Sequence, residues 1–438
     1  MSILYLELYM KQKKFIVEKL KKANADIGDK IKVETKNVTR KGVLMPHHQF
    51  SDEDIINIKL DNGYNVGLSI DKDTKITLLS KHKKVKKKAK EIPYDKNKET
   101  VSVIGTGGTI ACYVDYRTGA VHPASSAKDL AFSVPEVFEI CNLKTQVAFQ
   151  ILSENIDVAH WVDLAEKVAI ELNSGSKGVI IPHGTDTLGY TGAALSFMLN
   201  DLSGPVVLVG AQRSSDRPSS DAALNLIAAA NIASKTDIGE VVAVMHDETS
   251  DTKMSVHRGT KVRKFHTSRR DAFKTVNDIP IGIYEKGNIK FNKDYKKKSS
   301  KNVRIDGRFE EDVSILYYYP GMKPQDVPEK KGIVLVGTGL GHVSERLFPR
   351  IKKLSKKGTI FVMTSQCLFG RVNMSVYSTG RDLLKLGIIP CQDMLPETAY
   401  VKLMWALGHS NKKEDIERIM KKNIAGEIAD RTRSDVFL

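Results

Sequence analysis

The sequence predicts an α/β protein with a small all-β domain in front of it. From Val101 onward, short apolar runs typical of buried parallel strands alternate with helical segments. Before that, residues 28–80 consist of short β-branched runs divided by turns. A lysine-rich stretch, residues 81–99, separates the two patterns, and the length of 438 residues is enough for two or three domains.

The first domain, residues 1–80, is expected to begin with a short basic helix over residues 12–24. Its apolar positions would be Phe15, Ile16, Val17 and Leu20. The runs that follow predict a small β-barrel or β-sandwich, with a hairpin at "DNG" (61–63). These runs are "KIKVET", "KGVLM", "IINIKL", "YNVGLSI" and "KITLLS".

The segment 81–99 is interpreted as a linker. Seven of the ten residues from Lys81 to Lys90 are lysine, and mutually repelling charges with few apolar residues cannot form a core. The sequence leaves open whether these lysines contact RNA or only separate two domains.

Two α/β units are expected after the linker, over residues 100–325 and 326–438. The strands of the first unit are "VSVIG", "GVIIP", "PVVLVG" and "VVAVM", and its helices are "TLGYTGAALSFML" and "SSDAALNLIAAANIA", the second capped by serine or aspartate. The second unit has the strands "GIVLVGTGLG" and "TIFVMTSQC" and a helix, "SNKKEDIERIMKKNIAG", that would stop at its glycine.

Composition limits the possible classes of protein. The net charge of +16 and pI near 9.4 fit a polyanion partner such as RNA, and equally a surface kept soluble by lysine. The four cysteines are far apart and form no C-x-x-C pair, and no histidine spacing suggests a metal site. This disfavours structural zinc and a disulfide framework and fits a reducing, cytoplasmic location. The four are Cys112, Cys141, Cys367 and Cys391.

No membrane segment is expected. No apolar run reaches the roughly 18–20 residues that span a bilayer. The opening "MSILYLELYM" is short, contains Glu7 and has no basic region before it, so it does not fit a signal peptide. Both Met1 and Met10 are candidate starts.

The glycine-rich stretch "GTGGTIA" does not fit a dinucleotide site. A dinucleotide loop requires G-x-G-x-x-G, and here Ile110 occupies the third glycine position after Gly105 and Gly107. "GTGLGHV" (337–343) fails in the same way at His342, and there is no P-loop.

Instead, two turns present hydroxyl groups at what would be one edge of a parallel sheet. Thr106 and Thr109 follow one strand, and Thr185 and Asp186 follow another. Ligands of open α/β sheets lie outside the carboxyl ends of the strands. Either turn alone would be expected merely to cap a helix, but together they favour a nucleophile site.

"GTGGTIA" combined with "HGTDT" resembles the bacterial-type L-asparaginase family, and "VGAQR" (209–213) and "DAF" (271–273) extend the match over about residues 101–435. The resemblance implies asparaginase-like two-domain parallel sheets. The N-terminal β domain, "VDYRTGAVHPA" and "RGTKVRKFHTSRRDAF" resemble one branch in particular, the D subunits of archaeal glutamyl-tRNA(Gln) amidotransferases.

The resemblance assigns roles by position. It implies that Thr109 is the nucleophile and that Thr185, Asp186 and Lys264 are catalytic. It implies that Ser153 holds the α-amino or α-carboxylate end of the substrate, next to Glu154. Tyr116 is the best match for a mobile-loop tyrosine, with Tyr113 as a competitor. The expected substrate-binding residues are Ser153, Glu154, Tyr116, Gly107 and Gly184.

The chemistry of these residue types agrees with those roles. A threonine hydroxyl needs a base within reach, and Lys264 can act as one only after losing a proton. Burial lowers a lysine pKa and a neighbouring Asp186 raises it, so the sequence leaves the balance open. Backbone N–H groups near Gly107 and Gly184 are candidate oxyanion donors. His183 is expected to be structural.

The expected function is therefore that of a glutaminase subunit with no cofactor of its own. It would release ammonia from glutamine for a partner, the E subunit of the amidotransferase, that uses ATP and Mg²⁺ to convert Glu-tRNA(Gln) to Gln-tRNA(Gln), and the chain itself would form a homodimer core. Two alternatives are a free-standing asparaginase or glutaminase with an accessory domain, and an RNA-binding protein on an inactive hydrolase fold. The sequence does not decide between glutamine and asparagine.

Overall fold

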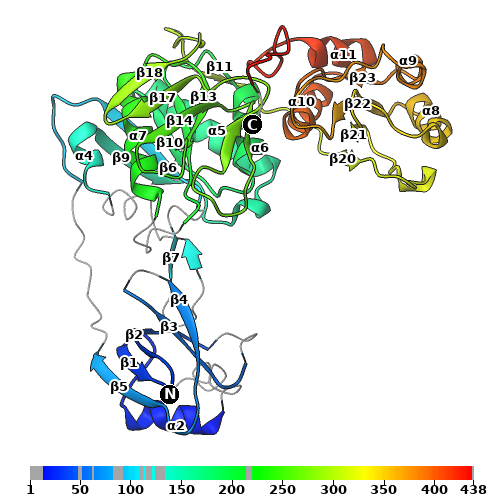
Figure 1. Ribbon diagram of the computed structural model, residues 1–438. Helices are drawn as coiled ribbons and strands as arrows, with labels where there is room; N and C mark the ends of the chain where they lie inside the picture. The colour runs from blue at the N-terminus through cyan, green and yellow to red at the C-terminus, as the bar shows by residue number, and fades with distance from the viewer. Residues whose placement is uncertain are drawn as a thin grey trace.

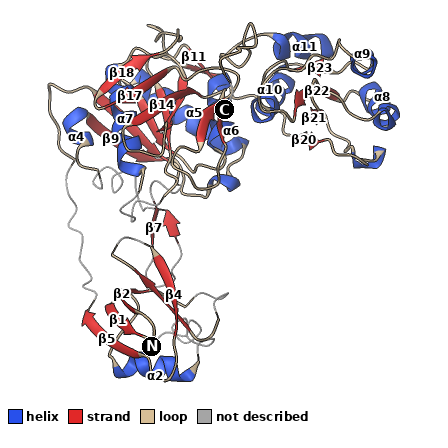
Figure 2. Ribbon diagram, viewed as in Figure 1, coloured by secondary structure: helices blue, strands red, loops and turns tan. Residues whose placement is uncertain are grey.

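The computed structural model describes residues 13–47, 52–61, 64–81, 92–107, 112–114, 121–123, 134–213 and 220–436. A small sheet near the N-terminus lies apart from two α/β units, which contact each other (Figure 1). The arrangement of helices around the sheets is followed most easily in Figure 2. Among the described residues, every helix is too short or too polar to span a membrane.

The N-terminal unit is one antiparallel sheet covered by one helix. Its five strands run in the order β4-β3-β2-β1-β5. The helix α2 (Lys14–Lys22) places Ile16 and Leu20 against alternate, inward-facing residues such as Ile31 and Val33 of the sheet. The strands are β1 (Lys30–Glu34), β2 (Thr39–Leu44), β3 (Ile55–Lys59), β4 (Asn65–Ser69) and β5 (Lys75–Ser80).

The central unit is built on an eight-stranded sheet in the order β18-β17-β14-β13-β12-β10-β6-β9. Five strands are parallel: β6 (Thr100–Gly105), β9 (Asn142–Val147), β10 (Val179–Pro182), β12 (Val206–Val209) and β13 (Val241–His246). Three antiparallel strands complete one side: β14 (Lys253–Arg258), β17 (Gly282–Glu285) and β18 (Asn288–Phe291).

Helices cover both faces of this sheet, as a buried parallel sheet requires. One core packs between the sheet and the pair α4 (Val137–Ile140) and α7 (Ala222–Lys235). The other packs between the sheet and the pair α5 (Val158–Asn173) and α6 (Leu188–Met198). Three two-stranded ribbons and a short turn complete the unit: β7 (Cys112–Val114) with β8 (Val121–Pro123), β11 (Leu199–Asn200) with β19 (Arg304–Ile305), β15 (Val262–Lys264) with β16 (Phe273–Thr275), and η2 (Ser153–Asn155).

The C-terminal unit is a smaller parallel sheet in the order β20-β21-β22-β23. Its helix α10 (Pro396–His409) lies against α6 of the central unit, where Tyr190 meets Tyr400 and Phe197 stacks on Trp405. The remaining elements are β20 (Val313–Tyr317), η3 (Pro324–Asp326), β21 (Gly332–Gly337), η4 (Glu345–Leu347), α8 (Phe348–Lys356), β22 (Ile360–Ser365), α9 (Ser378–Lys385), β23 (Ile389–Pro390) and α11 (Lys413–Lys421).

The predicted α/β class with a small N-terminal β domain is confirmed. Among the described residues that domain is a single sheet whose outer strands β4 and β5 are not paired with each other, and not the predicted barrel or sandwich. The last helix was expected to continue to Gly426, whereas α11 ends at Lys421. Gly426 has φ +75° and lies so close to Arg258 that a Cβ atom would stand 2.5 Å from its Cδ. The first turn of α7 is capped by serine, one of the two predicted possibilities: Ser220 Oγ accepts from the Ala222 N–H at 3.1 Å. The Asp221 carboxylate instead accepts from the backbone of Gln212 and Arg213 and from the Asn225 side chain.

Candidate active site

The candidate site lies at the carboxyl ends of two neighbouring parallel strands. β6 and β10 are adjacent in the sheet, so the turns that follow them emerge at the same edge. Thr106 Oγ1 donates a hydrogen bond of 2.8 Å to the carbonyl of Pro182 and joins the two turns. The first turn continues past Gly107 toward Thr109, which lies outside the described residues, as does Tyr116; the second carries Thr185 and Asp186.

Lys264 connects both side chains of the second turn. Its Nζ donates to Thr185 Oγ1 at 2.8 Å and to Asp186 Oδ1 at 2.8 Å. Thr185 is buried and Asp186 is exposed. Lys264 Nζ therefore lies between the buried hydroxyl of Thr185 and the exposed carboxylate of Asp186.

The placement of Lys264 depends on strand pairing rather than on nearness in sequence. Lys264 is the last residue of β15 and pairs with Phe273 of β16. Phe273 is fully buried and fixes that ribbon against the central core. The lysine thus reaches Thr185 across 79 positions of sequence.

Two glycines make the close approaches that bring the turns together. A Cβ on Gly184 would lie 2.6 Å from Ser153 Cβ, so only glycine lets η2 settle on this turn. Thr187 Oγ1 adds a hydrogen bond of 2.7 Å to the Ser153 carbonyl. Gly107 has φ +98°, and a Cβ there would lie 2.6 Å from the carbonyl oxygen of Ile151.

The predicted substrate-binding residues differ in how far they are buried beside this turn. Ser153 is buried beside Gly184, whereas Glu154 is exposed. Tyr113 belongs to β7, of which only the backbone is described. The structure therefore brings together Thr185, Asp186, Lys264, Ser153 and Gly184, with Gly107 at the end of the neighbouring strand.

Burial favours the neutral form of His183, and its ring is hydrogen-bonded to the glycine turn. It is fully buried, and burial lowers its pKa to about 4. Nδ1 lies 2.7 Å from the Gly184 carbonyl oxygen, which can only accept, so Nδ1 carries the proton. His183 supports the glycine turn, in agreement with the structural role expected for it.

Residues that sequence reasoning did not single out also shape the site. A Cβ on Gly210, which follows β12, would lie 2.8 Å from Thr185 Cγ2. The buried Asp221 holds the loop after Gly210 by accepting from the backbone N–H groups of Gln212 and Arg213, each at 3.0 Å. The "VGAQR" motif pointed to Gly210 and the loop after it. Asp221, which holds that loop, lies at the start of the next helix, α7, and no motif pointed to it.

The C-terminal unit holds the segment that carries Lys264. Lys261 Nζ donates to Asp393 Oδ2 at 2.6 Å in a pair that is 1% and 3% exposed. Arg263 pairs with Glu397 of α10 at 3.1 Å. The hydroxyl of Thr398 in the same helix donates to the Thr260 carbonyl at 2.8 Å. We call residues 258–264 the lysine segment.

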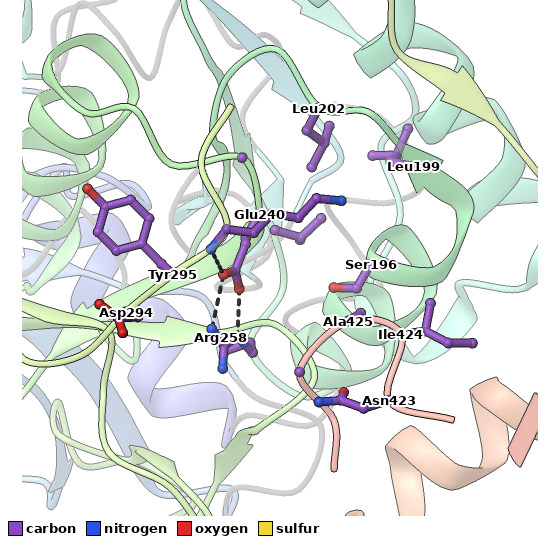
Figure 3. A pocket seen from close by; sticks show the side chains of 14 residues that line it. Ser196, Leu199, Leu202, Glu240, Arg258, Asp294, Tyr295, Asn423, Ile424 and Ala425 are labelled. Atoms are coloured by element: carbon purple, nitrogen blue, oxygen red, sulfur yellow. Dashed lines mark hydrogen bonds and ion pairs between the residues drawn. The ribbon is translucent and has the colours of Figure 1, made fainter. Parts of the chain in front are cut away.

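Within the described residues, no group of three or more His, Cys, Asp or Glu side chains is arranged to hold a metal ion. Two cavities are lined by neither Thr185, Asp186 nor Lys264. One of about 360 Å³ lies beside Thr187, between α5, α6 and α10. The other, of about 320 Å³, lies at the opposite edge of the central sheet, and residues 294–296 and 423–426 form part of its wall (Figure 3).

Comparison with known proteins agrees with this architecture. Residues 100–297 match the model "Asparaginase, N-terminal", residues 312–420 match "Glutaminase/Asparaginase C-terminal domain", and residues 25–79 match "GatD N-terminal domain". The thermostable L-asparaginase from Thermococcus kodakarensis superposes with a TM-score of 0.70 at 31% identity, over 76% of this chain and 100% of that one. The expected asparaginase-like fold is thereby confirmed.

Two relatives match along nearly the whole chain. The D subunit of glutamyl-tRNA(Gln) amidotransferase from Pyrococcus furiosus is 52% identical over 437 residues, which cover 97% of this chain and 99% of that protein. The protein of the same name from Pyrococcus abyssi is 50% identical, over 96% of this chain and 99% of that protein. Both matches include the N-terminal sheet, whereas the asparaginase structure covers only 76% of this chain.

Proposed function

The chain belongs to the family of glutamyl-tRNA(Gln) amidotransferase D subunits, and from this membership we propose that it is the glutaminase subunit of a tRNA-dependent amidotransferase. It hydrolyses the side-chain amide of glutamine and supplies the ammonia to a partner subunit that converts Glu-tRNA(Gln) to Gln-tRNA(Gln). The observation that carries the proposed chemistry is the contact of Lys264 Nζ with both Thr185 and Asp186 at the sheet edge.

In the proposed mechanism, the Thr109 hydroxyl attacks the amide carbon of glutamine. Thr185 and Lys264, oriented by Asp186, take up the hydroxyl proton and deliver a proton to the leaving nitrogen, which departs as ammonia. Water then hydrolyses the acyl ester to glutamate and regenerates the free hydroxyl. Lys264 acts as a base only while it is deprotonated.

Substrate binding is proposed to use the surroundings of the same turn. Ser153 binds the α end of glutamine, with Glu154 and Tyr116 as further contacts. Backbone N–H groups beside Gly107 and Gly184 stabilise the developing oxyanion, because the absence of Cβ atoms lets the main chain approach the substrate.

The domain division proposed for this chemistry is a β domain over 1–80, a linker over 81–99, a catalytic unit over 100–325 and a second α/β unit over 326–438. Most of the lysine-rich stretch lies outside the described residues. The proposed assembly is a homodimer core of this chain with the E subunit of the amidotransferase, in the cytoplasm. The proposal assigns ATP and Mg²⁺ to the E subunit, since the sequence of this chain contains no P-loop motif for a nucleoside triphosphate.

The test of the nucleophile is Thr109→Val, which preserves side-chain shape and removes the hydroxyl. Glutamine hydrolysis should fall by about 10³-fold or more, since losing one member of a catalytic unit removes most of its effect. Mass spectrometry of the quenched wild-type reaction should find the acyl group on the peptide containing Thr109. Near-normal hydrolysis by Thr109→Val would contradict the assignment.

A second measurement separates the amidotransferase role from the free-standing asparaginase alternative. The rate of glutamine hydrolysis is expected to rise when the E subunit and Glu-tRNA(Gln) are added, because ammonia released without an acceptor is wasted. Full-rate turnover of the isolated chain, unaffected by either addition, would favour the alternative.

A further inference from the structure

His246 and Asn225 form a buried hydrogen-bonded pair beside the candidate active site. His246 is the last residue of β13, and Asn225 lies on α7. β13 is adjacent to β12, and β12 to β10, so the carboxyl end of β13 reaches the same edge of the sheet as the Thr185 turn. Both side chains are fully buried. His246 Nδ1 lies 2.7 Å from Asn225 Oδ1, and the mechanism proposed above uses neither residue.

The Asn225 amide holds the loop that follows β12. We call residues 210–213 the Gly210 loop. Asn225 Nδ2 donates to the carbonyl of Gly210 at 3.0 Å and to Asp221 Oδ2 at 3.1 Å. The Asp221 carboxylate in turn accepts from the backbone N–H groups of the last two residues of the loop. One buried amide therefore fixes the loop at its start and, through Asp221, at its end.

The orientation of this amide identifies donor and acceptor in the buried pair. Asn225 Nδ2 uses its two hydrogens on Gly210 and Asp221, so Oδ1 can only accept, and His246 Nδ1 carries the proton. Burial, the largest effect, lowers the pKa of His246, while the carboxylates of Asp221 and Asp251 act in the opposite direction. The ring that is favoured by burial is neutral and keeps its single proton on Nδ1. Nε2 faces Asp251 Oδ1 at 3.4 Å, near the limit of a hydrogen bond.

The Gly210 loop touches the Thr185 turn directly. A Cβ atom on Gly210 would stand 2.8 Å from Thr185 Cγ2 and 3.2 Å from the His183 carbonyl oxygen. The main chain at Gly210 therefore packs against the Thr185 methyl group with no room for a side chain. The hydroxyl of the same threonine is hydrogen-bonded to Lys264 at 2.8 Å. A displacement of Gly210 consequently alters the geometry of the Thr185–Lys264 contact.

We propose that Asn225 and His246 are positioning residues for amide hydrolysis. His246 fixes the orientation of the Asn225 amide, and Asn225 fixes the Gly210 loop. The loop in turn fixes the Thr185 methyl group, so that the hydroxyl stays aligned with Lys264. Both residues act through Thr185 and carry out no chemical step themselves. The effect on hydrolysis rests on the function proposed above, whereas the effect on the Gly210 loop does not.

The kinetic test compares two buried asparagines on α7. Asn225→Leu removes the hydrogen bond that Asn225 donates to the Gly210 loop. Asn231→Leu is the matched control, because the Asn231 amide is buried on the same helix but donates to the Ile227 carbonyl and the Tyr284 hydroxyl. Both changes leave buried polar groups without a partner and lower stability, but only Asn225→Leu releases the loop.

The two variants should therefore differ in kcat. Asn225→Leu should lower kcat for glutamine by about 10- to 100-fold, because small misplacements of reacting groups have effects of this size. KM should stay within about twofold, because Ser153 keeps its contacts with Gly184 and Thr187. Asn231→Leu should keep the wild-type kcat per folded molecule. Equal kcat values in the two variants would overturn the proposal.

Two variants of His246 give a second comparison, which decides the question if Asn225→Leu does not fold. An asparagine amide places its nitrogen close to the position of Nδ1, so His246→Asn keeps a donor for Asn225. His246→Leu removes the donor and leaves a buried amide oxygen without a partner. kcat should fall by about 10-fold or more in His246→Leu and by about twofold or less in His246→Asn. An equal fall in both variants would contradict the positioning role.

Hydrogen exchange tests the positioning without an assay of activity. The backbone N–H groups of Gln212 and Arg213 should exchange about 10-fold faster or more in Asn225→Leu and His246→Leu than in the wild type or Asn231→Leu. Unchanged exchange would show that the buried pair does not hold the loop. If the wild type hydrolysed no glutamine, the proposed function would fail, and the exchange result would still decide whether the pair holds the loop.

Discussion

The buried pair Lys261–Asp393 connects the C-terminal unit to the segment that carries Lys264, and Asp393→Asn tests its contribution. The change keeps the size of the side chain and one oxygen acceptor but removes the charge. Asp393 also accepts from the Ala429 N–H, at 3.1 and 3.2 Å. Arg371 Nη2 lies 3.9 Å from Asp393 Oδ1. Three groups therefore converge on one carboxylate.

The expected loss of stability follows from burial. Lys261 and Asp393 are 1% and 3% exposed, so water cannot replace the lost partner. At 2.6 Å and an effective dielectric constant of about 20, the gross attraction is about 6 kcal/mol. The cost of burying both charges already offsets part of this. Breaking such a pair leaves one charge uncompensated and costs about 3–5 kcal/mol; the retained amide oxygen places Asp393→Asn near the lower end, about 3 kcal/mol.

The assay is urea denaturation followed by tryptophan fluorescence, because Trp405 lies on α10 of the C-terminal unit. Asp430→Asn, a change at an exposed carboxylate, is the matched control and should unfold as wild type. The double variant Lys261→Met/Asp393→Leu removes both charges and should recover about 2 kcal/mol relative to the sum of its single changes.

The reasoning would be refuted by two results. A cost below about 1 kcal/mol for Asp393→Asn would show that the pair is not held out of water. Additive effects in the double variant would show that the two charges do not interact. Glutamine hydrolysis should fall together with stability, since the displaced lysine segment ends at Lys264.

Three further predictions concern the candidate site and the buried histidines. Lys264→Met should lower glutamine hydrolysis by about 10³-fold or more while the folded circular dichroism spectrum is kept, and wild-type rates would exclude a proton-transfer role. Gly107→Ala should reduce activity far more than Gly175→Ala. Both glycines have positive φ, but only at Gly107 would the new Cβ collide with a neighbour, the Ile151 carbonyl. Equal losses of activity in the two variants would indicate that backbone strain alone is responsible. Stability should fall as pH decreases from about 6.5 toward 4, by up to about 1.4 kcal/mol per pH unit for each buried histidine. His183 and His257 have pKa values lowered by burial to about 4 and about 3, so the unfolded chain takes up protons first. Denaturation midpoints at pH 7 and pH 5 measure this loss, and His183→Gln should make it smaller.

Much of the fold was predictable because its signals are local. Alternating β-branched residues such as Ile31 and Val33 predicted strands in the N-terminal domain. Continuous apolar runs predicted the buried strands β6, β10, β12 and β13. The end of α11 was not predictable from its glycine. Gly426 serves a distant contact with the Arg258 side chain, and no local pattern encodes that.

The sequence by itself determined that hydroxyls follow two strands, and that the residue types of an amidohydrolase are present. Thr185 and Asp186 are adjacent in a turn, so their placement at the sheet edge follows from the strand before them. The contact with Lys264 was implied only by resemblance. Only the tertiary structure decided that Asp393 and Glu397 hold the lysine segment, and that residues 294–296 and 423–426 enclose a cavity. These contacts join segments more than a hundred positions apart, and such pairings depend on how helices and sheets pack, which no short-range periodicity records.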